Sequence, residues 1–342
     1  MASDFGFFPN EVRENPQREF GNAGRGLIVP LKLAGTNEPP DYAITSPNSW
    51  NRSNCITRAA TEEPGMSGMS IVTYDRHIEL DIKTKEPFDR IWAFHHREAP
   101  LLTVPDSLSD GICCPALDND EMTLIPLSRP VEQIRLCASV ADSSFAHSAF
   151  YGFSLENGRS GVLYHSFGIN GNTYAAINRN PQIVRQASGL CPDLVIVSLG
   201  TNDSYGASFD PADADVQITR LIDSIRRNMP ASVLLLTTPM EHCRRIRSKG
   251  RTYRKPNPNA CAMRECILRQ AALYRLPVWD FYAAAGGDGA MGRWADLGIA
   301  NADRVHLSRE GYRLQGKLFY DAIMKAYDHY RKHNGELKIL LN

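Results

Sequence analysis

The sequence predicts an α/β domain in its second half and a β-rich domain ahead of it. Residues 193–199 and 232–237 are continuously apolar, as strands buried on both faces of a parallel sheet are, and residues 277–281 form a shorter third run. Apolar residues at helical spacing lie between these runs. In residues 41–153, by contrast, short β-prone stretches alternate with Gly, Pro, Asn and Asp. We therefore expect an open parallel sheet covered by helices and, before it, a β-sandwich of roughly 110 residues.

The individual elements follow from the same patterns. The clearest strands of the β-rich part are residues 70–74, 77–82, 90–94 and 134–140. In the second half we expect a strand at residues 161–165 and helices at residues 218–229, at residues 259–274 and from Ser308, whose hydroxyl can cap the first turn. Residues 249–259 are polar, basic and proline-rich, so we expect a long surface loop there, beside the carboxyl ends of the strands.

Composition narrows the classes of function. The 342 residues contain 38 Lys and Arg against 38 Asp and Glu, so the chain as a whole has no net field that attracts nucleic acid or an anionic membrane. A small or neutral substrate fits this charge balance better than nucleic acid or an anionic membrane does. No stretch approaches the roughly 18 consecutive apolar residues of a membrane span, and the first residues lack the basic and apolar regions of a signal peptide.

The eight cysteines have neither the density of a disulfide scaffold nor the spacing of a zinc finger. We expect buried thiols. If any pair is bridged, the candidate is Cys243 with Cys261 or Cys266, because that bridge would close the polar loop between them.

Two motifs near predicted strand and helix ends carry side chains that can do chemistry. The strand that ends at Leu199 runs into Gly-Thr-Asn-Asp, where Asn202 can donate a hydrogen bond to a developing oxyanion. Alternatively, Asn202 and Asp203 form an Asx turn that caps the next element. Near the C-terminus, Asp303 can hold the imidazole of His306 and leave its other ring nitrogen as a base, although a histidine at a helix start is often a surface or capping residue.

A third motif is the glycine-rich segment 166–173, which comes after the predicted strand at 161–165. A turn of this kind can point a backbone N–H into the crevice, which is the second sort of donor that an oxyanion hole needs. The alternative is a simple bend in the chain.

In chain order, the glycine-rich segment, Gly-Thr-Asn-Asp and Asp-x-x-His resemble the second, third and fifth sequence blocks of the SGNH (GDSL-like) hydrolases, and the resemblance covers about residues 161–332. It implies a flavodoxin-like, three-layer α/β/α fold that needs no cofactor and no metal. It also implies that Gly171 and Asn202 are oxyanion donors, that His306 is the general base, and that Asp303 orients it. Gly168 is near enough to compete with Gly171.

Four further stretches resemble bacterial peptidoglycan O-acetylesterases, which are SGNH enzymes with a carbohydrate-binding-like sandwich inserted after the first helix: residues 20–30, 33–37, 150–155 and 161–165. This resemblance implies an SGNH domain made of residues 1–40 and 154–342, with the inserted β-sandwich at residues 41–153. The insertion either binds glycan or packs against the hydrolase core, and both alternatives remain open.

The nucleophile of the family is missing from this chain. The first SGNH block ends in Gly-Asp-Ser-His, which occurs nowhere here, and residues 1–5 match the residues expected directly after that block. We expect that Met1 is an internal methionine and that the nucleophilic serine lies upstream of it; the alternative is a degraded gene whose product is a pseudoenzyme. Ser3 is the nearby hydroxyl that could substitute. An export signal upstream would make the protein periplasmic or extracellular, whereas Met1 as the real start would make it cytoplasmic.

The resemblance implies a carboxylic ester hydrolase that removes O-acetyl groups from peptidoglycan or another polysaccharide through an acyl-enzyme. We expect no nucleic acid partner. One alternative is a catalytically inactive glycan-binding protein on the same fold. Another is a metal-dependent hydrolase that uses His95, His96 or His165, which is weaker because adjacent histidines point in opposite directions on a strand.

Overall fold

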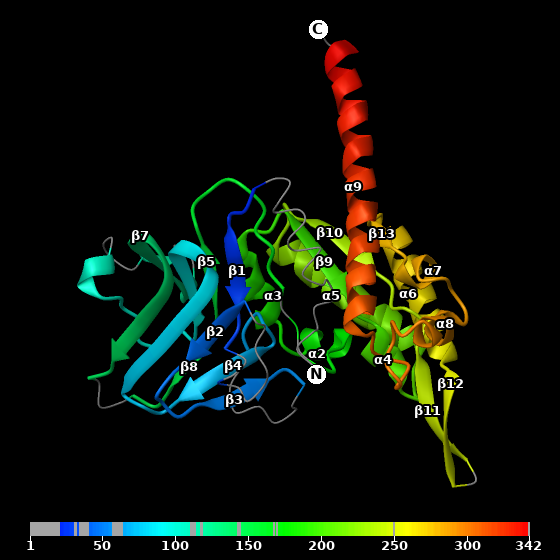
Figure 1. Cartoon of the computed structure of the whole chain (residues 1–342), viewed down its shortest axis with the longest axis horizontal. Coiled ribbons are helices and arrows are strands. Elements are labelled where there is room, and N and C mark those ends of the chain that lie inside the picture. The colour runs from blue at the N-terminus through cyan, green and yellow to red at the C-terminus, as the bar shows by residue number, and fades with distance from the viewer. Residues whose placement is uncertain are drawn as a thin grey trace. The chain divides into compact units, whose positions relative to one another are not determined.

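The computed structural model describes residues 21–30, 33, 41–56, 64–109, 114–116, 119–141, 145–166, 168, 170–248 and 250–340 (Figure 1). These residues form two compact units. The first contains the described residues up to 193 together with 220–232, and the second contains residues 194–219 and 233–340.

The first unit is built on an eight-stranded antiparallel sheet in the order β3-β4-β8-β5-β7-β6, with β1 paired to β8 and β2 paired to β5. The long strand β5 pairs with β2 through its first half and with β8 through its second. All eight strands are hydrogen-bonded into one sheet, and the β-sandwich that we expected stays a prediction. The strands of the sheet are β1 (Gly24–Ile28), β2 (Tyr42–Thr45), β3 (Asn51–Asn54), β4 (Met69–Thr73), β5 (His77–His95), β6 (Cys114–Ala116), β7 (Asn119–Ser139) and β8 (Ser148–Glu156).

The two faces of β5 differ as the alternation of its sequence predicts. Ile78, Leu80 and Ile82 are fully buried, whereas Glu79 and Asp81 between them face the other side. Burial of such side chains contributes roughly 1.5–3 kcal/mol each. This alternation fixes the register of β5, because a slip by one residue would exchange its two faces.

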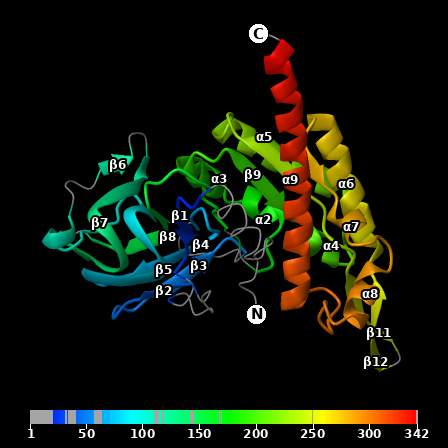
Figure 2. The ribbon, with the colours of Figure 1, turned by 45° about the horizontal axis from the view of Figure 1, so that its top comes forward.

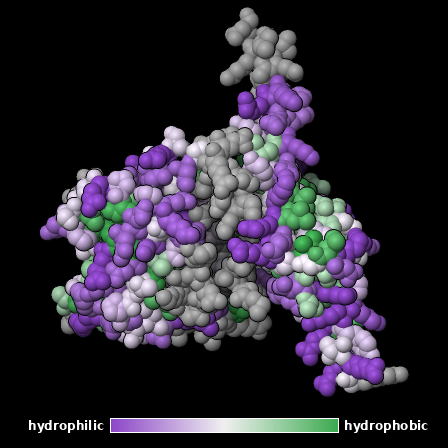
Figure 3. All heavy atoms as spheres, viewed as in Figure 1, coloured by the Kyte–Doolittle hydropathy of each residue, from purple (hydrophilic) through white to green (hydrophobic). Residues whose placement is uncertain are grey.

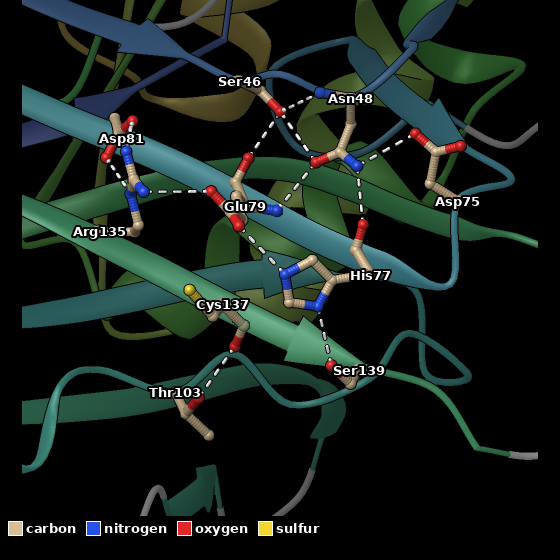
Figure 4. A network of polar contacts seen from close by, with 10 residues as sticks. All are labelled: Ser46, Asn48, Asp75, His77, Glu79, Asp81, Thr103, Arg135, Cys137 and Ser139. Atoms are coloured by element: carbon tan, nitrogen blue, oxygen red, sulfur yellow. Dashed lines mark hydrogen bonds and ion pairs between the residues drawn. The ribbon is translucent and has the colours of Figure 1, made fainter.

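The outer face of β5 and β7 carries a network of polar side chains (Figure 4). Arg135 donates to both carboxylate oxygens of Asp81, at 2.8 and 2.9 Å, and reaches Glu79 at 3.2 Å. His77 bonds to Glu79 and to Ser139. Because these groups lie on neighbouring strands, the network ties the strands together; Ser46, Asn48, Asp75, Thr103 and Cys137 extend it.

Besides its part of α5 (Pro211–Asn228), the described part of the first unit contains four short helices: the 3-10 helix η1 (Asp106–Leu108), α2 (Tyr174–Asn178), α3 (Gln182–Ala187) and the 3-10 helix η2 (Ser188–Leu190). Gln186 in α3 accepts from the backbone N–H of Met66 at 2.9 Å, and Nη2 of Arg185 donates to both carboxylate oxygens of Glu121, near the start of β7. These contacts hold α3 against the strands.

The second unit is built on the parallel sheet β13-β10-β9. Its strands are β9 (Leu194–Ser198), β10 (Val233–Thr237) and β13 (Val278–Trp279), which match the three apolar runs of the sequence. Its helices are α4 (Thr201–Tyr205), α6 (Pro258–Tyr274), α7 (Phe281–Ala284), α8 (Ala290–Asp296) and α9 (Arg309–Leu340), while α5 (Pro211–Asn228) has residues in both units. The α/β class is thereby confirmed.

Helix starts follow the predicted capping chemistry. Ser308 precedes α9, and its hydroxyl accepts from the N–H of Gly311 at 3.3 Å. Asn257 caps α6 with its side chain, and Pro258 occupies the first turn, where its missing N–H costs nothing. No helix among the described residues is long and apolar enough to cross a bilayer.

Three sequence expectations were wrong. Residues 77–82 and 90–94 belong to one strand, because bulges between Lys83 and Arg90 accommodate Pro87, which cannot donate to the ladder. Residues 161–165 form a single parallel bridge, Asn22 with Val162, instead of a strand. Residues 249–259 are not a long loop: β12 (Arg251–Pro256) pairs with β11 (Cys243–Ser248) in a hairpin. The boundaries predicted at residues 41 and 153 stay a prediction.

Candidate active site

The parallel sheet places the ends of its strands at one edge. β9 leads into Gly200 and α4, β10 leads into residues 238–243, and β13 leads into Asp280. Because β9, β10 and β13 run in the same direction, these three segments meet at the carboxyl edge, where open α/β sheets bind their ligands. The predicted Asn202 lies on the first of these segments.

Asp303 and His306 form a hydrogen-bonded pair in the loop before α9. Asp303 Oδ2 lies 2.7 Å from His306 Nδ1, and Asp303 Oδ1 accepts from the backbone N–H groups of Val305 and His306 at 2.9 and 3.0 Å. An ionised carboxylate only accepts hydrogen bonds, so His306 Nδ1 carries the proton and Nε2 is left as a proton acceptor. This is the arrangement of a general base with its orienting carboxylate.

The charge state of Asp303 supports that assignment. Burial raises the pKa of Asp303, but the hydrogen bonds from the side chain and backbone of His306 and from the backbone of Val305 outweigh it and hold the pKa below its ordinary value. The side chain of His306 is 59% exposed and that of Asp303 is 37% exposed. The imidazole is therefore fixed on one side and open to a reacting group on the other.

The loop that carries the pair is anchored by backbone contacts. Ala300 and Leu307 form an antiparallel bridge, and the N–H of Ser308 donates to the carbonyl of Ile299 at 3.1 Å. The N–H of Cys243 donates to the carbonyl of Arg304 at 2.8 Å, which joins the loop to the segment after β10. These contacts position His306 at the carboxyl edge.

Asn202 is exposed in the first turn of α4. The helix cap is Gly200, whose φ of 115° brings the chain sharply out of β9, and no side chain caps the helix. Asn202 and Asp203 both lie inside α4, and the alternative in which they form an Asx turn and cap the next element stays a prediction. The amide of Asn202 has the donor chemistry that an oxyanion site requires.

Sequence reasoning missed a buried group behind this edge. His242 is 1% exposed, its ring stacks on Tyr205 at 6.0 Å, and its Nε2 lies 3.2 Å from Nδ2 of Asn257. Burial, opposed in part by the carbonyl of Met240, lowers the pKa of His242 to about 4. Asn257 also donates to the carbonyl of Ser204 at 2.9 Å, which ties α4 to the segment after β10. A histidine five residues after the end of a predicted buried strand was the available signal.

Gly171, the other predicted oxyanion donor, belongs to the first unit. Its φ is 75°, and the turn leads directly into α2, where Thr173 caps the first turn by accepting from the N–H of Ala176. Ile56 lies beside the glycine: a Cβ at position 171 would be 3.4 Å from its Cδ1. Gly171 thus sits in a turn just before a helix, and its role as an oxyanion donor stays a prediction. Ser3 lies outside the described residues.

The histidines of the metal-dependent alternative are engaged by protein groups. His95 is buried and directs Nδ1 at the carbonyl of His96 and Nε2 at the hydroxyl of Thr123, and His165 accepts from the N–H of Leu27. The described residues contain no group of three or more side chains arranged to hold a metal ion. Cys243, Cys261 and Cys266, our candidates for a bridge, are free thiols.

Comparison with known proteins finds one matching family model and several similar solved structures. The model of the GDSL-like lipase/acylhydrolase family matches residues 142–314. A solved peptidoglycan O-acetylesterase superposes with a TM-score of 0.74 at 18% identity, covering 94% of this chain and 87% of its own. An acetyl xylan esterase, AlAXEase, covers 46% of this chain and 78% of its own (TM-score 0.36, 18% identity), and an aryl esterase of M. smegmatis covers 47% and 77% (TM-score 0.35, 16% identity). No curated protein sequence matches.

Proposed function

The chain belongs to the GDSL-like lipase/acylhydrolase family, and from this premise we propose that it is a serine esterase that removes O-acetyl groups from a polysaccharide. Peptidoglycan is the first candidate, since the superposable solved structure is a peptidoglycan O-acetylesterase. At 18% identity that likeness concerns the fold, so the substrate is our proposal. We place the reaction outside the cytoplasm, where such a polymer lies.

In the proposed reaction, Nε2 of His306 removes the proton from a serine hydroxyl as the serine attacks the acetyl carbonyl carbon. Asp303 stabilises the imidazolium that forms and keeps Nδ1 protonated. Asn202 and the backbone N–H of Gly171 donate to the oxyanion, each worth roughly 10²–10³ in rate. The imidazolium then protonates the departing sugar oxygen, and His306 activates a water that releases acetate.

The observation that carries this proposal is the geometry of the Asp303 and His306 pair. The contact of 2.7 Å from Oδ2 to Nδ1, with two backbone N–H groups holding the other carboxylate oxygen, fixes both the tautomer and the direction of the ring. A surface or capping histidine does not need a dedicated carboxylate.

The test is acetate release by the protein expressed from the complete reading frame that contains the Met1 codon. O-acetylated peptidoglycan, acetylated xylan and a small acetyl ester are compared, with chemically de-O-acetylated peptidoglycan as the blank. We expect acetate from the peptidoglycan, and at higher kcat/KM than from xylan. Turnover of the small ester alone would reject the substrate, and glycan binding with no turnover of any ester would favour the inactive binding protein.

A further inference from the structure

The β11 and β12 hairpin is a strongly cationic arm of the second unit. Seven of the fourteen residues from 243 to 256 are Lys or Arg, and none is Asp or Glu. Both views of the ribbon show the hairpin extending from the helices of its unit (Figures 1 and 2), and hydrophilic residues cover it (Figure 3). The chain as a whole is neutral, so this charge is a local feature.

The pairing of the two strands places like charges opposite each other. Arg245 faces Arg254 and Arg244 faces Lys255 in the antiparallel register. Directly opposed like charges destabilise a sheet, by a few tenths of a kcal/mol up to about 1 kcal/mol per pair. Among the residues that the structure describes, none of these four cations forms an ion pair that offsets the repulsion. The cationic residues therefore do not stabilise the hairpin, and their presence needs another explanation.

One face of the arm carries three arginines. Side chains alternate along a strand, so Arg245 and Arg247 share a face with Cys243, and their partner Arg254 lies on the same face. Arg245 and Arg247 are exposed and Arg254 is half-buried. The opposite face carries Arg244, Arg251 and Lys255, so the two faces have equal charge and the second provides a matched internal control.

The arginine face continues toward the catalytic loop. The N–H of Cys243, at the base of the arm, donates to the carbonyl of Arg304, two residues before His306. Burial and the nearby carboxylate of Glu241 raise the pKa of Cys243, and the charges of Arg304 and Arg254 oppose them. Both guanidinium groups therefore lie near the same thiol, and a row of cations leads from the arm to the loop of His306.

We propose that the face formed by Arg245, Arg247, Arg254 and Arg304 binds carboxylate groups of an anionic polysaccharide while an acetylated residue of the same polymer reaches His306. Guanidinium groups pair with carboxylates through two parallel N–H bonds, which suits a chain that carries carboxylates at intervals. The proposal rests on the proposed esterase function and narrows its substrate from polysaccharides in general to acidic ones. Nucleic acid also attracts cations but carries no carboxylic ester for the base at the end of the row. Anionic lipid carries acyl esters, so the test below includes lipid vesicles; we commit to the polysaccharide because its carboxylates recur at intervals along one chain, as the arginines do along the arm.

The test measures binding of the full protein to immobilised polygalacturonate, with dextran as the neutral control, at low and physiological salt. We expect binding to polygalacturonate that weakens as salt rises, and none to dextran. The double variant Arg245→Gln with Arg254→Gln should bind about tenfold more weakly, because two ion pairs with the polymer are lost. Arg251→Gln with Lys255→Gln removes the same charge from the other face and should cost less than about threefold.

The outcomes separate this proposal from the function on which it rests, because binding requires no turnover. Equal losses in the two double variants, or no binding to polygalacturonate, would overturn the cationic face as a substrate site. Tighter binding to duplex DNA or to phosphatidylglycerol vesicles would overturn it in favour of those ligands. Because Arg254 lies near the base of the arm, the single variant Arg247→Gln provides a second test at an exposed site. Arg245→Lys should recover only part of the affinity lost in Arg245→Gln, because an ammonium group keeps the charge but cannot form the two parallel N–H bonds.

Discussion

Replacement of Asp303 by Asn keeps the shape of the side chain and removes its charge. The carbonyl oxygen of an asparagine can still accept from the backbone N–H groups of Val305 and His306, which lie at 2.9 and 3.0 Å from Oδ1. Its NH₂ group would then face Nδ1 of His306 at the position of Oδ2, 2.7 Å away. A donor at that place forces Nδ1 to accept, so the proton moves to Nε2 and the base is lost.

The size of the effect follows from this change of tautomer. In a buried serine protease triad the same substitution lowers kcat about 10⁴-fold. Here Asp303 is 37% exposed, so water can compete for the ring, and we expect a loss of about 10²–10⁴ in kcat. KM for a small acetyl ester should change little, because neither side chain binds the ground state more tightly than solvent does.

The assay is steady-state hydrolysis of a small acetyl ester near neutral pH, with circular dichroism to verify the fold. Asp296→Asn makes the same chemical change at an exposed position of α8 and serves as the control, which should retain full activity. If Asp303→Asn kept more than a third of the wild-type kcat, Asp303 would not orient the base and our interpretation of the loop would be refuted.

Three further changes test the framework behind the site. Gly200→Ala should lower the free energy of unfolding by roughly 1–3 kcal/mol in urea melts, because φ is 115° there and the new Cβ would approach Met263 at 3.1 Å. Glu241→Ala should cost roughly 1–3 kcal/mol in the same assay, since this buried carboxylate accepts from the N–H groups of Gly289 and Met291 at the start of α8. The folded-state pKa of His242 is about 4, below the usual 6.5, so the unfolded chain takes up its proton first and wild-type stability should fall from pH 6.5 toward 4. His242→Gln should flatten that part of the stability profile, and an unchanged slope would show that another group causes it.

The sequence predicted those parts of the molecule that depend on periodicity and local chemistry. The runs that became β9 and β10 are apolar on both faces, Ser308 caps α9, and three residues separate a carboxylate from the imidazole that it holds. Each of these signals is contained within a few neighbouring residues. The class of the fold and the Asp303 and His306 pair therefore followed from sequence.

The parts that were missed depend on pairing between distant or polar segments. The β11 and β12 hairpin has neither face buried, so its strands lack the alternation that reveals most strands; Gly250, whose φ is 73°, was the available sign of a tight turn. The break at Pro87 suggested two strands because a bulge cannot be inferred from propensity. The contact of His242 with Asn257 joins two loops that are fifteen residues apart. No local sequence pattern indicates that two such loops come together.

Removal of the imidazole of His306 from the protein expressed from its complete reading frame decides whether this loop carries a catalytic base. We measure kcat for a small acetyl ester in His306→Ala and in His333→Ala, an exposed histidine of α9 that serves as the control. We predict a loss of at least about 10³-fold for His306→Ala and none for His333→Ala. Comparable activity in both variants would contradict the proposed mechanism, because no base at position 306 would then be required.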